Sequence, residues 1–536
     1  MYRREETGKH LIALCFCGLC FAITAYYLIV GYGTYLDADM SSELALASHL
    51  AKEGKLISEE WLYSTEVRVF STQLVFTPLM ALVSNNWRLV RTAGCMILML
   101  MLMASAYYVS RTMGTKRHYA YIFAGLNVLP ISIVYAQMIV IGAYYVPHAI
   151  LINLFTAWAV GICKEKHRMR KAVGVVLLGT AMCATSIRYL LCAVLPATAA
   201  GLYMFIFSFD NQEEWKEGKW VAAILSIAAV CGILGYKLGE KLLAANFLWN
   251  PGEFGGRRLI SLTSENLFSL VDQSMDGLLK LMGFREHRYL ISVQGVLSLG
   301  VIGLLLLSVV LIVRVLRGNQ KDHITCFGVL TLVMSAIMTL MTFMFIESMY
   351  VNRYWIPVMC LGGPIMALCL SKEKNVLFRR IGLFAFVFVV MGSSMVNIRD
   401  SMAAPEIDEL DRASAARIEE TGLSFGYASF WNANILSEIT DGRIEVVSFK
   451  IIEEKETYPK LNSSWLEVKA DMEMNRPEEP VFLLLTKHES EQFDAFLKSC
   501  QAEAMDLPDK GMNLYIVETQ RRLFETIEAF CAAEGA

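Results

Sequence analysis

The chain has 536 residues, of which 55% are hydrophobic and only 18% are charged. Soluble domains carry nearer a quarter of charged residues, so this composition excludes an ordinary soluble enzyme and favours a membrane protein. The net charge of -3 is nearly balanced, and no basic stripe indicates a nucleic-acid partner. Residues 398–536 hold about twice as many acidic as basic side chains, whereas the preceding part is basic.

The chain begins with a basic segment, "MYRREETGKH", followed by the apolar run "LIALCFCGLCFAITAYYLIVGYG". This run is too long for a signal peptide and has no small-x-small cleavage site, so we expect a retained first membrane helix. Runs of this kind recur along the first three quarters of the chain and predict about 11 spans. The expected spans are 11–33, 89–110, 119–136, 145–163, 172–187, 190–209, 220–238, 293–313, 324–346, 354–370 and 381–397.

The basic clusters between these spans orient the chain. Cytoplasmic loops are enriched in lysine and arginine, so we place six clusters in the cytoplasm. They are "YRREETGK", "RTMGTKRH", "KEKHRMRK", "KEGK", "RVLRGNQK" and "KEKNVLFRR". This assignment predicts a multi-pass protein of the plasma membrane with a cytoplasmic N-terminus and an extracytoplasmic C-terminus.

Two longer segments then lie outside, within a membrane domain of residues 1–397. The first, residues 34–88, contains the apolar stretch "STQLVFTPLMALV" at 71–83. A helix of about 13 residues is about 20 Å long against a hydrocarbon core of about 30 Å, so we expect a juxtamembrane helix. The second, residues 239–292, reads as turns around short amphipathic helices.

The pattern changes after residue 397. Helical stretches such as "EIDELDRASAARIEE" alternate with the short apolar runs "RIEVVSF", "VFLLLT" and "NLYIV". This alternation predicts a small α/β domain over 398–536. Of the 13 cysteines, all but Cys500 and Cys531 fall in apolar runs, so neither a disulfide framework nor structural zinc is expected.

Three short motifs occur at the starts of expected outer segments and spans, and their order along the chain is informative. Asp39, followed by Glu43, comes just after the first helix, "WRLVRTAG" opens the next expected span, and "NRYWIPVMCLGGP" opens a late one. This order resembles the GT-C glycosyltransferase superfamily, and in particular the family-39-like protein O-mannosyltransferases and aminoarabinose transferases. Those enzymes carry an aspartate at the start of the first outer loop, which Asp39 matches best. Arg353-Tyr354-x-x-Pro357 is similar to the family's Arg-Tyr-x-x-Pro.

The resemblance implies a polytopic helical glycosyltransferase of the inverting type. It would move a sugar from a polyprenyl-phosphate donor to a glycan, lipid or protein acceptor at the outer face of the bilayer. Asp39 would be the general base, because a carboxylate at the membrane edge can have its pKa raised by desolvation. Asp37 would be a second carboxylate or a metal ligand. The alternative is that "LDAD" simply caps the helix "MSSELALASHLAKEG", since aspartate is a favoured N-cap.

Arginines are the candidate ligands for the donor phosphate, since a guanidinium binds phosphate oxygens with two hydrogen bonds. Arg353 is the leading candidate, and Arg68 and Arg188 are weaker ones; we assign Tyr354 and Glu43 to substrate binding as well. The alternative for each arginine is an anchor to lipid headgroups. No cofactor is certain, and a divalent cation held by Asp37 or Asp39 is left open.

Other interpretations stay open from sequence alone. In "GYASFWNANIL", Tyr427, Phe430 and Trp431 lie beside Asn432 and Asn434, a composition that suits either a sugar-binding surface or a domain core. A transporter or flippase of lipid-linked glycans is an alternative function, although no inverted repeat is evident. A non-catalytic membrane scaffold is another.

Overall fold

The computed structural model describes residues 2–31, 36–64, 69–164, 168–207, 212–244, 247, 264–286, 289–318, 322–345, 352–403, 407–453, 457–461, 465–505, 507 and 511–534. The chain divides into two compact units. The first, the helical unit, comprises Met1–Val30, Cys95–Ala244 and Gly252–Ala403. The second, the sheet unit, comprises Gly31–Gly94, Ala245–Pro251 and Ala404–Ala536. The first expected outer loop therefore folds with the C-terminal residues, whereas the sequence grouped it with the spans.

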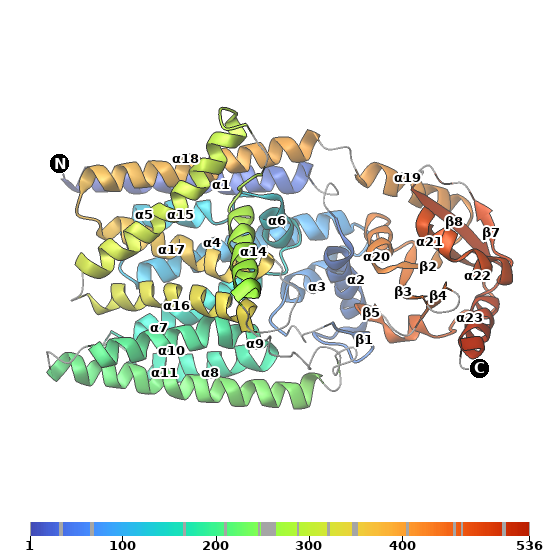
Figure 1. Ribbon diagram of the computed structural model, residues 1–536, viewed down its shortest axis with the longest axis horizontal. Coiled ribbons are helices and arrows are strands. Elements are labelled where there is room, and N and C mark those ends of the chain that lie inside the picture. The colour runs from blue at the N-terminus through green and yellow to red at the C-terminus, as the bar shows by residue number, and fades with distance from the viewer. Residues whose placement is uncertain are drawn as a thin grey trace. The chain divides into compact units, whose positions relative to one another are not determined.

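Helices make up the helical unit, and most of them run alongside one another (Figure 1). They are α1 (Tyr2–Val30), α4 (Trp87–Thr112), α5 (Arg117–Leu126), α6 (Ile133–Tyr135), η1 (Ala136–Ile141), α7 (Val146–Ile162), α8 (Arg168–Thr185), α9 (Ile187–Tyr189), η2 (Leu190–Val194), α10 (Leu195–Phe207), α11 (Gln212–Gly239), η3 (Glu240–Ala244), α14 (Ser264–Leu281), α15 (Val293–Gly318), α16 (His323–Phe345), η4 (Asn352–Trp355), α17 (Ile356–Lys372) and α18 (Val376–Ala403). The first turns of α4 belong to the sheet unit.

The chain is a multi-pass membrane protein. Among the described residues, eight helices are long and apolar enough to cross a membrane, or nine if the bent pair Ile133–Ile141 and Val146–Ile162 forms one span. The expected span 119–136 is broken, because α5 ends at Leu126 and helix resumes at Ile133. Pro130 lies in this break and lacks a backbone donor. The expected count of about eleven spans is therefore not confirmed.

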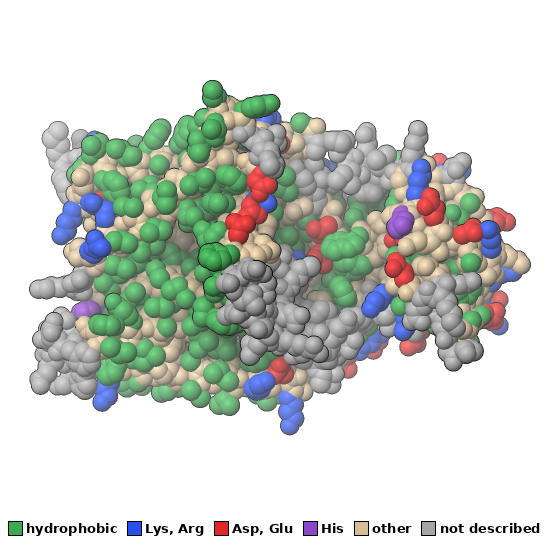
Figure 2. Space-filling view, viewed as in Figure 1, with side chains coloured by type: hydrophobic (Ala, Val, Ile, Leu, Met, Phe, Trp, Pro, Cys, Tyr) green, Lys and Arg blue, Asp and Glu red, His purple; other side chains and the backbone are tan. Residues whose placement is uncertain are grey.

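Several basic clusters lie at one end of the helical unit. The rings of His10 and His118 are 5.8 Å apart, and the Lys116 amide donates to Ser371 Oγ at 3.1 Å. Figure 2 shows Lys and Arg side chains at the left edge of this unit. These contacts place the second cluster beside residues that directly adjoin the first and sixth clusters, all three of which the sequence places in the cytoplasm. A common end is what that topology requires; which compartment it faces stays a prediction.

Ion pairs link helix ends in the same region. Arg314 Nε lies 2.8 Å from Glu373 Oε2, and Lys372 Nζ lies 2.6 Å from Asp322 Oδ2. The two pairs therefore link the C-terminal end of α17 to α15 and to the start of α16.

Apolar side chains cover much of the face of the helical unit that Figure 2 shows. On α15, Leu306 is 62% exposed, and on α18, Phe384 is 69% exposed. Such a surface is unfavourable in water and is matched by lipid chains. The α15 and α18 surfaces are therefore suited to face the bilayer.

The sheet unit contains a mixed six-stranded sheet, in the order β4-β3-β2-β6-β8-β7. The central β2 is parallel to β3 and β6, and the other pairs are antiparallel. The strands are β2 (Phe425–Ser429), β3 (Glu445–Glu453), β4 (Thr457–Lys460), β6 (Val481–Thr486), β7 (Glu503–Met505) and β8 (Met512–Val517). The three apolar runs noted in the sequence become β3, β6 and β8, which confirms the expected α/β domain.

Helices flank this sheet, and hydrophobic clusters lie on both of its faces. They are α19 (Ile407–Glu420), α20 (Phe430–Ile439), η5 (Lys469–Met472), α21 (Lys487–Gln492), α22 (Asp494–Ser499) and α23 (Gln520–Glu534). The parallel connection from β2 to β3 runs through α20, as a parallel crossover requires.

The first-loop segment adds helices and one short strand to the same unit. Helix α2 (Ala38–Glu53) packs against α20 and against α3 (Gln73–Leu82). Strand β1 (Trp61–Leu62) pairs antiparallel with β5 (Glu467–Val468). The apolar stretch 71–83 is thus a short helix, as its length predicts.

Candidate functional site

The acidic stretch at the start of the first loop begins α2. Asp37 is the N-cap: its backbone is extended, with φ -132° and ψ 171°, and its side chain accepts a hydrogen bond from the Met40 amide at 2.8 Å. The helix ends at Gly54, whose φ of +67° lies in the left-handed region that glycine tolerates. The capping interpretation is therefore correct for Asp37.

Asp39 lies in the first turn of the same helix and is half-buried. Its backbone carbonyl accepts a hydrogen bond from Ser42 Oγ at 2.7 Å. A carboxylate in this turn interacts favourably with the N-terminal end of the helix dipole. Since Asp37 already provides the cap, Asp39 is not needed for that task, and its role as a base stays a prediction.

Glu43 lies one turn further along α2 and is 6% exposed. The Thr72 hydroxyl donates to its carboxylate, and Gln73 Nε2 donates to the carboxylate at 3.1 Å and to the Glu43 carbonyl at 2.9 Å. These contacts join α2 to the start of α3. Glu43 thus fixes two first-loop elements, and a role in substrate binding stays a prediction.

A buried ion pair that the sequence analysis did not predict supports this segment. Arg91 in α4 and Glu438 in α20 are 1% and 0% exposed, and Arg91 Nη2 lies 2.7 Å from Glu438 Oε2. Arg91 also donates to the Met40 carbonyl at 2.8 Å, and its guanidinium carbon lies 5.9 Å from the centre of the Phe76 ring. The pair therefore fixes the first turn of α2. Arg91 belongs to "WRLVRTAG", but no signal in the sequence pairs it with Glu438.

In the helical unit, Arg188 lies close to two tyrosine rings. Its Nη1 donates to the Tyr145 hydroxyl at 2.9 Å. Its guanidinium carbon is 5.6 Å from the centre of the Tyr145 ring and 5.3 Å from that of Tyr354. The cation–π contacts with the two rings and the hydrogen bond to Tyr145 fix the position of the Arg188 guanidinium. The structure thus brings together Arg188 and Tyr354, two residues that the sequence assigned to substrate binding.

Arg353 and Tyr354 lie in the 3-10 helix η4, immediately before α17, and both are half-buried. The Tyr354 ring also lies 5.5 Å from the ring of Phe343. The following residue, Trp355, donates from its indole nitrogen to the Ser274 carbonyl at 3.0 Å. These contacts fix η4 against α14 and α16. Arg68, the third predicted phosphate ligand, lies outside the described residues.

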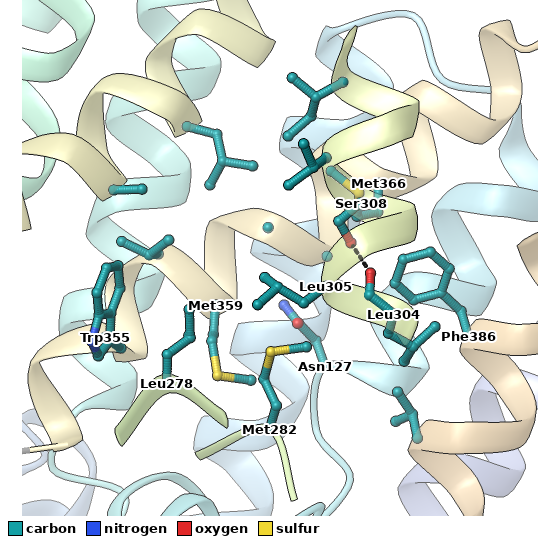
Figure 3. Close-up of a pocket in the computed structure, with 18 of the residues that line it drawn as sticks. Asn127, Leu278, Met282, Leu304, Leu305, Ser308, Trp355, Met359, Met366 and Phe386 are labelled. Carbon is teal, nitrogen blue, oxygen red and sulfur yellow. Dashed lines mark hydrogen bonds between the residues drawn. The ribbon is translucent and has the colours of Figure 1, made fainter. Parts of the chain in front are cut away.

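A large apolar cavity starts at η4. Its volume is about 460 Å³, and it lies among α5, α14, α15, α16, α17 and α18. Trp355 lies at one edge of the cavity, and Met359, Leu305 and Phe386 also line it (Figure 3). Ser308 also lines it, but its hydroxyl is bonded to the Leu304 carbonyl at 2.7 Å. The cavity therefore suits a hydrocarbon chain.

Comparison with solved structures shows which proteins share this fold. Over 94% of this chain and 97% of the other, the structure matches the crystal structure of apo ArnT from Cupriavidus metallidurans, with a TM-score of 0.59 and 11% identity. The same enzyme bound to undecaprenyl phosphate matches with a TM-score of 0.58 and 10% identity, over 93% and 97% of the two chains. The chain has the GT-C glycosyltransferase fold.

The GT-C fold confirms the resemblance that the order of the sequence motifs indicated. No protein-family model matches the sequence, and no curated protein matches it either. At 10 to 11% identity the similarity establishes the fold alone. The roles of individual residues in this chain must therefore come from its own geometry.

A metal site is the remaining element of the expected chemistry. Within the part of the chain that the structure describes, no three His, Cys, Asp or Glu side chains are placed together to hold a metal ion. Asp37, one of the two proposed ligands, already accepts the Met40 amide. A divalent cation held by Asp37 or Asp39 therefore stays a prediction.

Proposed function

We propose that this chain is a membrane glycosyltransferase that takes its sugar from a polyprenyl-phosphate donor. The observation that carries the proposal is that Arg188 contacts a residue next to the apolar cavity of the helical unit. Tyr354 contacts Arg188, and the next residue, Trp355, lines the 460 Å³ cavity. A polyprenyl phosphate has the same two parts, a charged head and a long hydrocarbon tail.

Each part of the donor has a matching surface. Arg188 and Arg353 would bind the phosphate, because a guanidinium offers a planar set of donors to phosphate oxygens. The part of the tail next to the phosphate would occupy the cavity, where burial of apolar surface contributes about 25 cal/mol per Å². The second ArnT structure contains bound undecaprenyl phosphate, which supports the same class of donor here.

The transfer itself needs a base and stabilisation of the leaving group. The acceptor hydroxyl oxygen forms a bond to the anomeric carbon as the bond to the donor phosphate breaks, and the hydroxyl proton passes to a base. We assign the base to Asp39, because it is half-buried and Asp37 already provides the helix cap. General base catalysis contributes about 10² to 10⁴ in rate. Arg188 and Arg353 would stabilise the negative charge that develops on the departing phosphate. Both arginines would thus act in donor binding and in transfer.

Binding of undecaprenyl phosphate to the purified protein tests the donor class. We expect Arg188→Gln to weaken binding about tenfold, which corresponds to about 1.4 kcal/mol. The matched control is Arg317→Gln, which removes an exposed arginine in the last turn of α15. Equal affinities in wild type and Arg188→Gln would contradict the proposed phosphate site, and an equal loss in both variants would reduce the effect to net charge.

A further inference from the structure

One face of α17, continued by its N-cap Trp355, forms a wall of the apolar cavity. Trp355, Gly362 and Met366 all line the cavity, at spacings that put them on one side of a helix. Trp355 and Met366 lie on opposite sides of the close-up in Figure 3. At about 1.5 Å per residue this wall is about 16 Å long, and Gly362 lies about two turns beyond Trp355. The Trp355 end is the one next to Tyr354, which contacts Arg188.

The volume of the cavity limits how much of a lipid tail it can hold. The volume is about 460 Å³, which is about three times the volume of about 150 Å³ that holds a benzene ring in a protein interior. With the same packing the cavity has room for about 18 carbon atoms, or about three to four isoprene units. An undecaprenyl chain contains many more. The cavity can therefore enclose only a part of such a tail, and a phosphate bound at Arg188 makes it the part next to the phosphate.

Two adjacent glycines on this wall differ in the space around them. A Cβ atom on Gly363 would lie 2.7 Å from Asn127 Oδ1, so a side chain there would have to displace Asn127. A Cβ atom on Gly362 would meet no described atom within 4 Å beyond its chain neighbours and the adjacent backbone of its own helix. Because Gly362 lines the cavity, this free space belongs to the cavity. The lack of a side chain at Gly362 therefore keeps the cavity open at this depth.

We propose that this chain recognises only the part of the donor tail next to the phosphate, about three to four isoprene units, and that Gly362 sets this length. Each atom that enters the cavity gains packing contacts. Atoms beyond the cavity stay among apolar lipid chains and gain little. Affinity should therefore rise with tail length and then level off. This inference rests on the proposed donor class and adds to it the recognised segment and the residue that limits it.

Competition binding to the full-length protein in lipid nanodiscs tests the proposal. The probe is labelled undecaprenyl phosphate. The competitors are neryl, (Z,Z)-farnesyl, nerylneryl and undecaprenyl phosphates, compared at equal mole fractions in the bilayer so that differences in partitioning do not enter. In the wild type, affinity should rise at least about tenfold from neryl to nerylneryl phosphate and change by less than about threefold from there to undecaprenyl phosphate.

Gly362→Leu is the test variant, and Gly303→Leu on α15 is the matched control. A Cβ atom on Gly303 would likewise meet no described atom within 4 Å, but Gly303 is exposed and does not line the cavity. Leucine favours a helix over glycine, so both variants should fold. Gly362→Leu should bind neryl phosphate as the wild type does and lose at least about tenfold in affinity for nerylneryl and undecaprenyl phosphates. Gly303→Leu should keep all four wild-type affinities.

The outcomes separate this inference from the proposed donor class. If undecaprenyl phosphate binds but affinity keeps rising beyond nerylneryl phosphate, or if Gly362→Leu binds the long donors as the wild type does, the inference is wrong and the donor class stands. An equal loss for neryl and undecaprenyl phosphates in Gly362→Leu would also overturn the inference, because the substitution would then act on the phosphate site. If undecaprenyl phosphate does not bind the wild type, the donor class itself is wrong and the inference falls with it.

Discussion

At the scale of single residues, the two aspartates of the first loop are separated by their hydrogen bonds. Asp37 accepts the Met40 amide, whereas Asp39 lies two residues further on, inside the first turn. Aspartate at an N-cap contributes about 1 kcal/mol relative to alanine, and asparagine is almost equivalent there. The two positions should therefore respond differently to the same substitutions.

Asp39→Asn should abolish sugar transfer and leave the unfolding temperature nearly unchanged. Asparagine cannot accept a proton near neutral pH, so the rate should fall by about 10² to 10⁴. Asp37→Ala should instead destabilise the protein by about 1 kcal/mol, and Asp37→Asn should change stability by only a few tenths. Thermal unfolding and transfer rates on the three variants check this. An active Asp39→Asn enzyme would remove Asp39 from the mechanism, and a dead Asp37→Asn enzyme would transfer the role to Asp37.

At the scale of elements, a buried ion pair joins α2, α4 and α20. Arg91 donates to both Glu438 and the Met40 carbonyl, and both charged side chains are almost fully buried. Removal of one member of a buried pair leaves an uncompensated charge, whereas joint replacement by apolar residues of similar volume is often nearly neutral. The pair therefore links the start of α2 to the sheet.

Glu438→Leu alone should destabilise the protein by about 3 to 5 kcal/mol. The double variant Arg91→Met with Glu438→Leu should recover most of that loss, because no charge is left buried. Chemical denaturation of the sheet unit, followed by Trp fluorescence in the full-length protein, measures both values. If the double variant were as unstable as the single one, the hydrogen bond from Arg91 to Met40 would be the more important contact.

The sequence predicted local secondary structure better than contacts between residues that lie far apart along the chain. The apolar stretch 71–83 was expected as a short helix and forms α3, because its length alone decides the outcome. The break in the expected span 119–136 was missed, since the apolar composition continues through the non-helical residues around Pro130. Arg91 and Glu438 are 347 residues apart, and no periodicity connects them. Nor could Gly362 be assigned to a cavity before the packing of α15 and α16 against α17 was known.

At the scale of the whole molecule, the topology predicts that the sheet unit is extracytoplasmic. Cys500 and Cys531 are the two cysteines outside the apolar runs of the sequence, and the structure distinguishes them. Cys500 is buried, which raises the pKa of its thiol to about 11, whereas Cys531 is exposed. Only a thiolate at the surface reacts readily with a maleimide.

A membrane-impermeant maleimide should therefore label Cys531 in intact protoplasts and leave Cys500 unmodified. Cys531→Ser should remove the label, and Cys500→Ser should retain it. Labelling of Cys531 only after the protoplasts are lysed would reverse the orientation of the chain. The proposed reaction at the outer face would then be wrong as well.

The division of the sheet unit among separate stretches of chain has a consequence for biosynthesis. Residues Gly31–Gly94 leave the ribosome long before their partners in Ala404–Ala536. At about 5 to 20 residues per second, the 347 residues between Arg91 and Glu438 take roughly 17 to 70 seconds to synthesise. During that interval Arg91 has no Glu438 to bind, and β1 has no β5 to pair with. The nascent first loop is therefore sensitive to protease until the last quarter of the chain has been translated, so its maturation is timed by translation of the C-terminal residues.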